Sequence, residues 1–128
     1  MSHVPKISDS EWQVMNFIWI NKTSTANQVV DALSKITNWK PQTIRTLINR
    51  LVNKGLIGYE IDKKDKKTYH YFALISEEDC KKEESRSFLK RVFNGSINAM
   101  FANFISDNQL STEEIDELKS ILQQKKKG

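Results

Sequence analysis

The sequence predicts a mainly helical chain with one small β-hairpin. Six segments carry apolar residues at the three- and four-residue spacing of amphipathic helices, and most of them begin with a residue that caps helices. Between residues 57 and 73 the period changes to two, which is the spacing of strands. The 128 residues, 38% apolar and 28% charged, fit one or two small globular domains.

The first two helices are predicted from their opening residues. Ser8 with Glu11, and Thr25 with Gln28, have the spacing of capping boxes, in which side chain and backbone satisfy each other's hydrogen bonds. The residues expected to face the core are Trp12, Met15, Ile18 and Trp19 in the first helix, and Val29, Val30, Leu33 and Ile36 in the second.

The third helix is predicted to have two different faces. Pro41 suits its first position and Gly55 the left-handed position after its end. One apolar stripe is formed by Ile44, Leu47, Ile48 and Leu51. The opposite face carries side chains that donate to phosphates or to base edges, and no acidic residue occurs from residue 39 to 59.

The hairpin is predicted from two alternating segments, residues 57–61 and 69–73, which flank a lysine-rich run. A helix-turn-helix followed by such a hairpin is a winged helix, whose wing lies along DNA beside the major groove that the third helix occupies. The residues expected to contact DNA are Lys40, Gln42, Thr43, Arg45, Thr46, Asn49, Arg50, Lys63, Lys64, Lys66 and Lys67.

The charge distribution supports this interpretation. Residues 1–76 hold 11 Lys and Arg against 6 Asp and Glu, whereas residues 77–128 hold 9 against 10. The positive charge is therefore concentrated around one helix and one hairpin. The alternative is a winged-helix protein-interaction adaptor that does not bind DNA and places the Arg45 face on an acidic protein.

Residues 1–75 are interpreted as a winged-helix DNA-binding domain and residues 76–128 as a helical dimerisation domain. Three helices are expected there, beginning after Ser76, Ser96 and Ser111. Such a short unit cannot bury its own apolar side chains, so we expect it to pair with a second copy. The residues expected in that homodimer interface are Phe88, Val92, Phe93, Ile97, Met100, Phe101, Phe104, Ile115, Leu118 and Leu122.

Catalytic, metal and membrane motifs are missing from the sequence. Two histidines, His3 and His70, and one cysteine, Cys80, stand without any nucleophile or phosphate-loop motif, so we expect no enzyme and no cofactor. The acidic residues 77–79 suit the first turn of a helix better than a metal site. No apolar run approaches the ~18 residues that span a bilayer, and no signal peptide begins the chain, which favours a cytoplasmic protein without membrane insertion.

Five segments together resemble the BlaI/MecI penicillinase-repressor family over nearly the whole chain. They are ISDSEWQVMNFIW, STANQVV, PQTIRTLINRLVNKG, FLKRVFNGSINAMFANF and LSTEEIDELKSIL. The resemblance implies a homodimeric winged-helix repressor. It also implies operators that are dyads with TACA and TGTA half-sites, near genes for β-lactamases or penicillin-binding proteins.

The resemblance also implies roles for particular residues. The DNA-reading positions of the family match Thr43, Arg45, Thr46 and Arg50, whereas Lys40 and Gln42 replace the serine and lysine of a frequent Ser-Pro-Lys-Thr motif. Such repressors are inactivated by proteolysis at an Asn-Phe bond, which matches Asn103-Phe104 and implies an upstream membrane sensor-protease system. The C-terminal cysteine cluster of copper-responsive relatives is missing.

Overall fold

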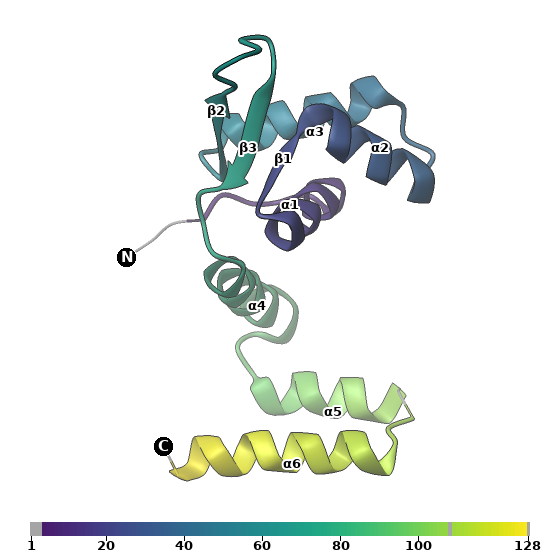
Figure 1. Cartoon of the computed structure of the whole chain (residues 1–128). Coiled ribbons are helices and arrows are strands. Elements are labelled where there is room, and N and C mark those ends of the chain that lie inside the picture. The colour runs from purple at the N-terminus through teal and green to yellow at the C-terminus, as the bar shows by residue number, and fades with distance from the viewer. Residues whose placement is uncertain (1–3, 108, 128) are drawn as a thin grey trace. The chain divides into compact units, whose positions relative to one another are not determined.

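The computed structural model describes residues 4–107 and 109–127 and confirms a mainly helical chain with a small sheet (Figure 1). The elements are α1 (Asp9–Asn21), β1 (Thr23–Thr25), α2 (Ala26–Ile36), α3 (Pro41–Asn53), β2 (Ile57–Ile61), β3 (Tyr69–Ala73), α4 (Glu77–Phe93), α5 (Ile97–Asp107) and α6 (Thr112–Lys127). Contacts divide the chain into two units, residues 1–83 and residues 84–128.

The predicted helix starts of the first unit are confirmed. The Ser8 amide donates to Glu11 Oε1 over 2.8 Å and the Glu11 amide donates to Ser8 Oγ over 3.2 Å. Thr25 and Gln28 form the same pair of hydrogen bonds at the start of α2. Helix α3 begins with Pro41 at its first position, and Gly55 follows it with a φ of 77°.

The sheet has one strand more than the sequence predicted. Strand β1 pairs antiparallel with β3, so that Thr23 lies opposite Phe72 and Thr25 opposite His70, and the strand order is β1-β3-β2. A strand of three residues is too short to show an alternating pattern, and only its pairing with β3 defines it. The hairpin itself is confirmed, with Tyr59 opposite Tyr71.

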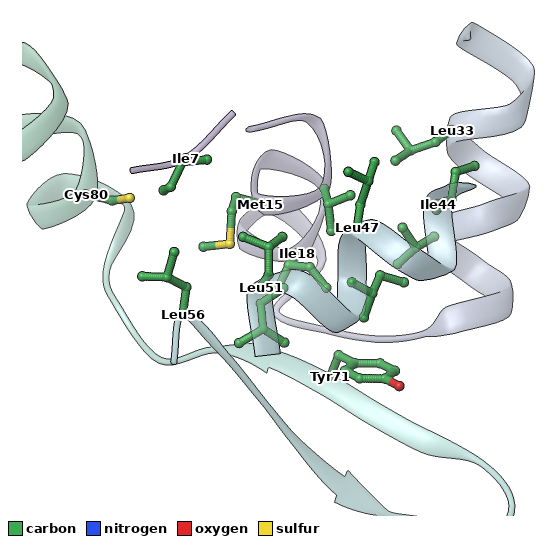
Figure 2. Packing of buried hydrophobic residues seen from close by; sticks show 14 residues of the cluster. Ile7, Met15, Ile18, Leu33, Ile44, Leu47, Leu51, Leu56, Tyr71 and Cys80 are labelled. Atoms are coloured by element: carbon green, nitrogen blue, oxygen red, sulfur yellow. The ribbon is translucent and has the colours of Figure 1, made fainter. Parts of the chain in front are cut away.

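The core of the first unit lies between α1, α2, α3 and the sheet. Figure 2 shows its buried side chains pointing toward one another, among them Ile44, Leu47 and Leu51 of α3, and Ile48 belongs to the same cluster. The set consists of Ile7, Val14, Met15, Ile18, Val29, Leu33, Ile44, Leu47, Ile48, Leu51, Leu56, Ile57, Tyr71 and Cys80. The chain therefore buries a single continuous cluster in this unit.

Two parts of the predicted core differ in the structure. Ile36 is 72% exposed, because it is the last residue of α2 and lies outside the buried cluster. Trp12, Trp19 and Val30 are only partly buried against the cluster, and the Trp19 indole N–H donates to the carbonyl oxygen of Ile75 over 3.1 Å. An indole ring is largely apolar but carries one N–H donor, so it suits the edge of a core.

The first turns of α4 belong to the first unit. Cys80 is 1% exposed and lies near Ile7 and Leu56 in Figure 2. The unit therefore extends eight residues beyond the boundary expected at residue 75, because α4 supplies a side chain to the core.

The second unit contains the rest of α4 with α5 and α6. Its predicted caps are confirmed: Ser96 Oγ accepts a hydrogen bond from the Ala99 amide, and Ser111 and Glu114 form a capping box. The phenyl rings of Phe88, Phe93 and Phe104 lie 5.8 to 6.5 Å apart, centroid to centroid. In the described ranges, no helix has the length and apolar character needed to cross a bilayer.

A buried charge joins α1 to the end of α3. Glu11 is 1% exposed, and its Oε1 accepts a hydrogen bond from Lys54 Nζ over 2.6 Å. Lys54 also donates to the carbonyl oxygen of Lys6 over 2.8 Å. Burial raises the pKa of the Glu11 carboxyl, but the hydrogen bonds from Lys54 and Ser8 outweigh burial and leave this pKa lowered. The ion pair therefore stabilises the fold while Glu11 is charged.

We expect Lys54→Met to lower the free energy of unfolding by about 2 kcal/mol at pH 7, because it strips a charged hydrogen bond from a buried carboxylate. The folded pKa of Glu11 is lowered, so this stabilisation exists above the ordinary glutamate pKa and disappears as the pH falls through the folded value. The three tryptophans all lie in the first unit, so urea unfolding followed by tryptophan fluorescence measures its stability.

The matched control is Lys35→Met, which removes an exposed ion pair with Asp31 and should change stability little. The difference between wild type and Lys54→Met should shrink when the experiment is repeated near pH 3. An equal difference at both pH values would contradict the assigned role of the ion pair.

Candidate nucleic-acid interface

The polar face of α3, called here the recognition face, consists of Gln42, Thr43, Arg45, Thr46, Asn49 and Arg50. It is available because the apolar stripe of the same helix is buried in the core. Gln42, Thr43, Asn49 and Arg50 are exposed, as is Lys40 just before the helix, whereas Arg45 and Thr46 are half-buried. A helix with this division presents hydrogen-bond donors without exposing apolar surface.

Two recognition-face residues are held by contacts within the chain. Arg45 Nη2 donates to Oδ1 of Asn27 over 2.6 Å, which joins α3 to the start of α2. Thr46 Oγ1 donates to the carbonyl oxygen of Gln42 over 2.9 Å, so its hydroxyl proton is used inside the helix while its oxygen can still accept. The sequence pattern placed both residues on the polar face but predicted neither contact.

The tip of the wing is ordered by two aspartates. Asp62 Oδ2 accepts hydrogen bonds from the amides of Lys64 and Asp65, over 3.0 and 2.8 Å. Asp65 accepts from the Lys67 amide and from the Thr68 hydroxyl. Short aspartate side chains often fold turns in this way. Both carboxylates face the turn, and the lysines at positions 63, 64, 66 and 67 are exposed.

His70 adds a further contact to this turn. Its Nε2 lies 3.0 Å from Oδ1 of Asp62, at the base of the wing. The backbone hydrogen bond from Asp65, the contact with His70 and the backbone hydrogen bond from Lys64 together lower the pKa of Asp62. His70 is therefore part of the wing, while His3 lies outside the described residues.

Three tyrosines connect the wing to the core. The rings of Tyr59 and Tyr69 are stacked at 4.7 Å with an angle of 8° between their planes, and Tyr71 lies 5.9 Å from Tyr59. Tyr71 is buried, whereas Tyr59 is exposed. Burial and the neighbouring tyrosines raise the pKa of Tyr71. Offset ring pairs across two strands stiffen a hairpin that would otherwise be held by backbone hydrogen bonds alone.

A basic hollow of about 470 Å³ lies between the start of α2, the recognition face and the wing. It is lined by Thr25, Ala26, Asn27, Arg45, Lys66, Lys67, Thr68, Tyr69 and Tyr71. Three of these residues are cationic and none is acidic. The fold thus brings Arg45 of α3 to the same concavity as two wing lysines, and it adds Asn27 and Thr68, which sequence reasoning did not select.

The residues predicted for dimerisation lie in α4, α5 and α6. Phe88, Phe93 and Met100 are half-buried within the second unit. The others are exposed by 39 to 60%: Val92, Ile97, Phe101, Phe104, Ile115, Leu118 and Leu122. Helices α5 and α6 also form an apolar groove of about 450 Å³ lined by Ile105, Leu110, Ile115, Leu118, Lys119 and Leu122. This chain alone leaves a large apolar surface in contact with water.

The predicted cleavage pair lies inside α5. Asn103 and Phe104 are both exposed, Phe104 by 45%, and the Asn103 carbonyl accepts a hydrogen bond from Ser106 Oγ over 3.1 Å. Phe104 also packs against Phe88 and Phe93, a contact that spacing along the chain does not predict. Helical backbone around the bond keeps it out of an extended, protease-accessible conformation.

The fold and the site define a winged helix-turn-helix protein with a basic recognition face and a lysine-rich wing. Residues 7–124 match the family model described as penicillinase repressor, and the chain belongs to this family. It is 42% identical over 120 residues to the methicillin resistance regulatory protein MecI of Mammaliicoccus sciuri, covering 94% of this chain and 95% of that protein. It is 40% identical over 126 residues to the penicillinase repressor of Bacillus licheniformis, covering 98% and 96%.

A solved relative gives the same fold together with DNA. The solution structure of the monomeric form of Bacillus licheniformis BlaI in complex with the blaP half-operator matches with a TM-score of 0.53 and 35% identity. The match covers 62% of this chain and 93% of that chain. This comparison supports the winged-helix class that the sequence predicted.

Proposed function

We propose that this protein is a cytoplasmic transcriptional repressor that binds palindromic operator DNA as a homodimer, with an operator at a β-lactamase or penicillin-binding-protein gene. The observation that carries this proposal is the exposed recognition face of α3 beside an ordered lysine wing, with no acidic residue between residues 39 and 59. The relative BlaI, whose solved structure holds a half-operator, supports the same assignment.

The geometry indicates different roles for the recognition face and the wing in DNA binding. The recognition face enters the major groove, where arginine, asparagine and glutamine side chains distinguish base edges. The lysines of the wing tip bind phosphates, which positions the protein without reading sequence. The aspartates fix the backbone of the turn that carries these lysines, so less backbone conformational freedom is lost on binding.

Substitution of one residue from each part tests this division. Arg45→Ala should cost roughly 1 to 3 kcal/mol and blur discrimination at one base pair, because an arginine that reads guanine makes a bidentate contact. Lys64→Ala should weaken binding to all sequences alike and flatten the dependence of affinity on salt. Fluorescence anisotropy with specific and random duplexes measures both. If the two variants lose specific and random binding by the same factor, Arg45 does not read bases.

The competing function is a winged-helix adaptor that contacts an acidic protein. A gel shift with duplex DNA at about 50 and 200 mM salt separates the two functions, because a protein that binds phosphates loses affinity steeply over this range. An adaptor would show no operator-dependent shift at either concentration.

We further propose that residues 76–128 form the dimer interface. The support is the exposed apolar surface of α5 and α6, which a second copy would cover. Two recognition faces would then address half-sites about one helical turn apart, roughly 34 to 36 Å.

Leu118→Glu should convert the dimer to a monomer, because it places a charge among the apolar residues of the α5–α6 groove. The matched control is Ile20→Glu, an equally large change at an 80% exposed residue of α1. Sedimentation velocity measures the result. A wild-type chain that sediments only as a monomer at tens of micromolar, with and without operator, would contradict the proposed interface.

We also propose that cleavage between Asn103 and Phe104, by a protease of an upstream membrane sensor system, inactivates the repressor. The bond lies within α5, so a protease reaches it only after local opening of that helix. Cutting would release residues 104–128 with the apolar face of α6 and thereby weaken dimerisation.

The fragment 1–103 should keep a folded winged helix but bind operator more weakly than the full chain. The physical reason is the loss of the second half-site contact, which in a dimer acts at a high effective concentration. The fragment and the full chain are titrated against the same operator duplex, with a single half-site duplex as the control. A dimeric fragment with full affinity would rule out this switch.

A further inference from the structure

We propose that Asn27, on α2, is a specificity-determining residue that positions the guanidinium group of Arg45 for base recognition. The inference rests on the proposed DNA-binding function and adds to it a residue outside α3 and the wing. It also gives a functional role to the hydrogen bond between α2 and the recognition face.

The hydrogen bond between the two residues connects the consecutive helices α2 and α3. Arg45 Nη2 donates to Asn27 Oδ1 over 2.6 Å, and the two residues lie 18 positions apart. Asn27 is the second residue of α2, immediately after a helix start fixed by the Thr25–Gln28 capping box. The residue before α2, Thr25, is also paired with His70 in the sheet. The Asn27 side chain that accepts the hydrogen bond from Arg45 is therefore carried by a fixed segment of backbone.

Among the residues around Arg45, the hydrogen bond with Asn27 is the interaction that orients its guanidinium group. Arg45 borders a smaller hollow of about 210 Å³ with Ala26, Ile48, Asn49 and Tyr71. Arg45 also borders the basic hollow, which contains Lys66 and Lys67, two cations that repel a guanidinium group. Neither hollow is lined by a carboxylate. The neutral amide oxygen of Asn27 therefore directs the arginine, and the other charged residues that line these hollows are cationic.

A neutral acceptor suits a DNA reader better than a carboxylate would. An aspartate at position 27 would form an ion pair with Arg45 and neutralise the positive charge that attracts the DNA duplex. The amide oxygen of Asn27 engages one N–H of the planar guanidinium fork and leaves the other donors for a base edge. Fixing the fork before DNA arrives reduces the conformational entropy lost on binding and favours one bidentate geometry.

The experiment compares wild type with Asn27→Ala, Asn27→Asp, Arg45→Ala and the double variant Asn27→Ala/Arg45→Ala. The probes are a duplex with TACA and TGTA half-sites, the set of its single base-pair substitutions, and a random duplex. Asn27→Ala should reduce discrimination by roughly 3- to 10-fold at the base pair that Arg45→Ala blurs, a part of the full value of a bidentate contact. Its affinity for the random duplex should change less than about twofold.

The Asn27→Asp variant separates the positioning of Arg45 from the effect of charge at position 27. Asn27→Asp keeps an oxygen acceptor for Arg45, so discrimination at that base pair should persist, while the new negative charge should weaken binding to every duplex. In the double variant the effect of Asn27→Ala on discrimination should vanish, because no guanidinium group remains to be positioned. The matched control is Asn16→Ala, an exposed asparagine of α1, which should leave both measurements unchanged.

The outcomes distinguish this inference from the proposed function. If wild type fails to prefer the operator duplex over the random one, the proposed function fails. If wild type discriminates and Asn27→Ala does so equally well or better, Asn27 does not position Arg45 for readout. Equal losses of specific and random binding in Asn27→Ala would also overturn the inference. Thermal melts of each variant, followed by tryptophan fluorescence, show whether the winged helix remains folded.

Discussion

Burial of the apolar stripe of α3 is the constraint on which the rest of the first unit depends. Full burial of a leucine or isoleucine side chain contributes roughly 1.5 to 3 kcal/mol, and α3 supplies four of them. Because this stripe is fixed against α1, α2 and the sheet, the opposite face of the helix points to solvent. The same packing places the helix beside β3, so that Arg45 and the wing lysines border one hollow.

Polar contacts then give the positively charged surface a defined shape. Lysines and arginines close together repel one another and would keep a loop extended. Asp62 and Asp65 fold the wing by accepting hydrogen bonds from backbone amides, and Asn27 holds Arg45 through its amide oxygen. These groups order the backbone of the wing and the side chain of Arg45 while leaving the surface positive, which is the requirement for binding a phosphate backbone.

The two units differ in how far they bury their own apolar side chains. The first unit buries most of its apolar residues by packing three helices against a three-stranded sheet, and it also buries the charge of Glu11 with the help of Lys54. The described residues of the second unit form no strand, and seven of the ten residues predicted for its interface remain exposed. A small helical unit has too much surface for its volume, so its apolar side chains stabilise it fully only when another surface covers them.

The sequence by itself determined the features that depend on neighbours along the chain. The helix starts at Ser8, Thr25, Ser96 and Ser111 and the buried stripe of α3 follow from spacings of three to seven residues, and all are present in the structure. Its resemblance to the penicillinase repressors was equally readable, because motifs in order along a chain need no fold to be compared.

Only the tertiary structure decided the features that join distant segments. Strand β1 exists because Thr23–Thr25 meets β3 nearly fifty residues later in the chain. Glu11 is buried because Lys54 reaches it, and Ile36 is exposed because α2 ends outside the buried cluster. The contact of Asn27 with Arg45 has no local pattern at all. Such contacts depend on how elements pack in three dimensions, and the spacing of residues within one element does not encode them.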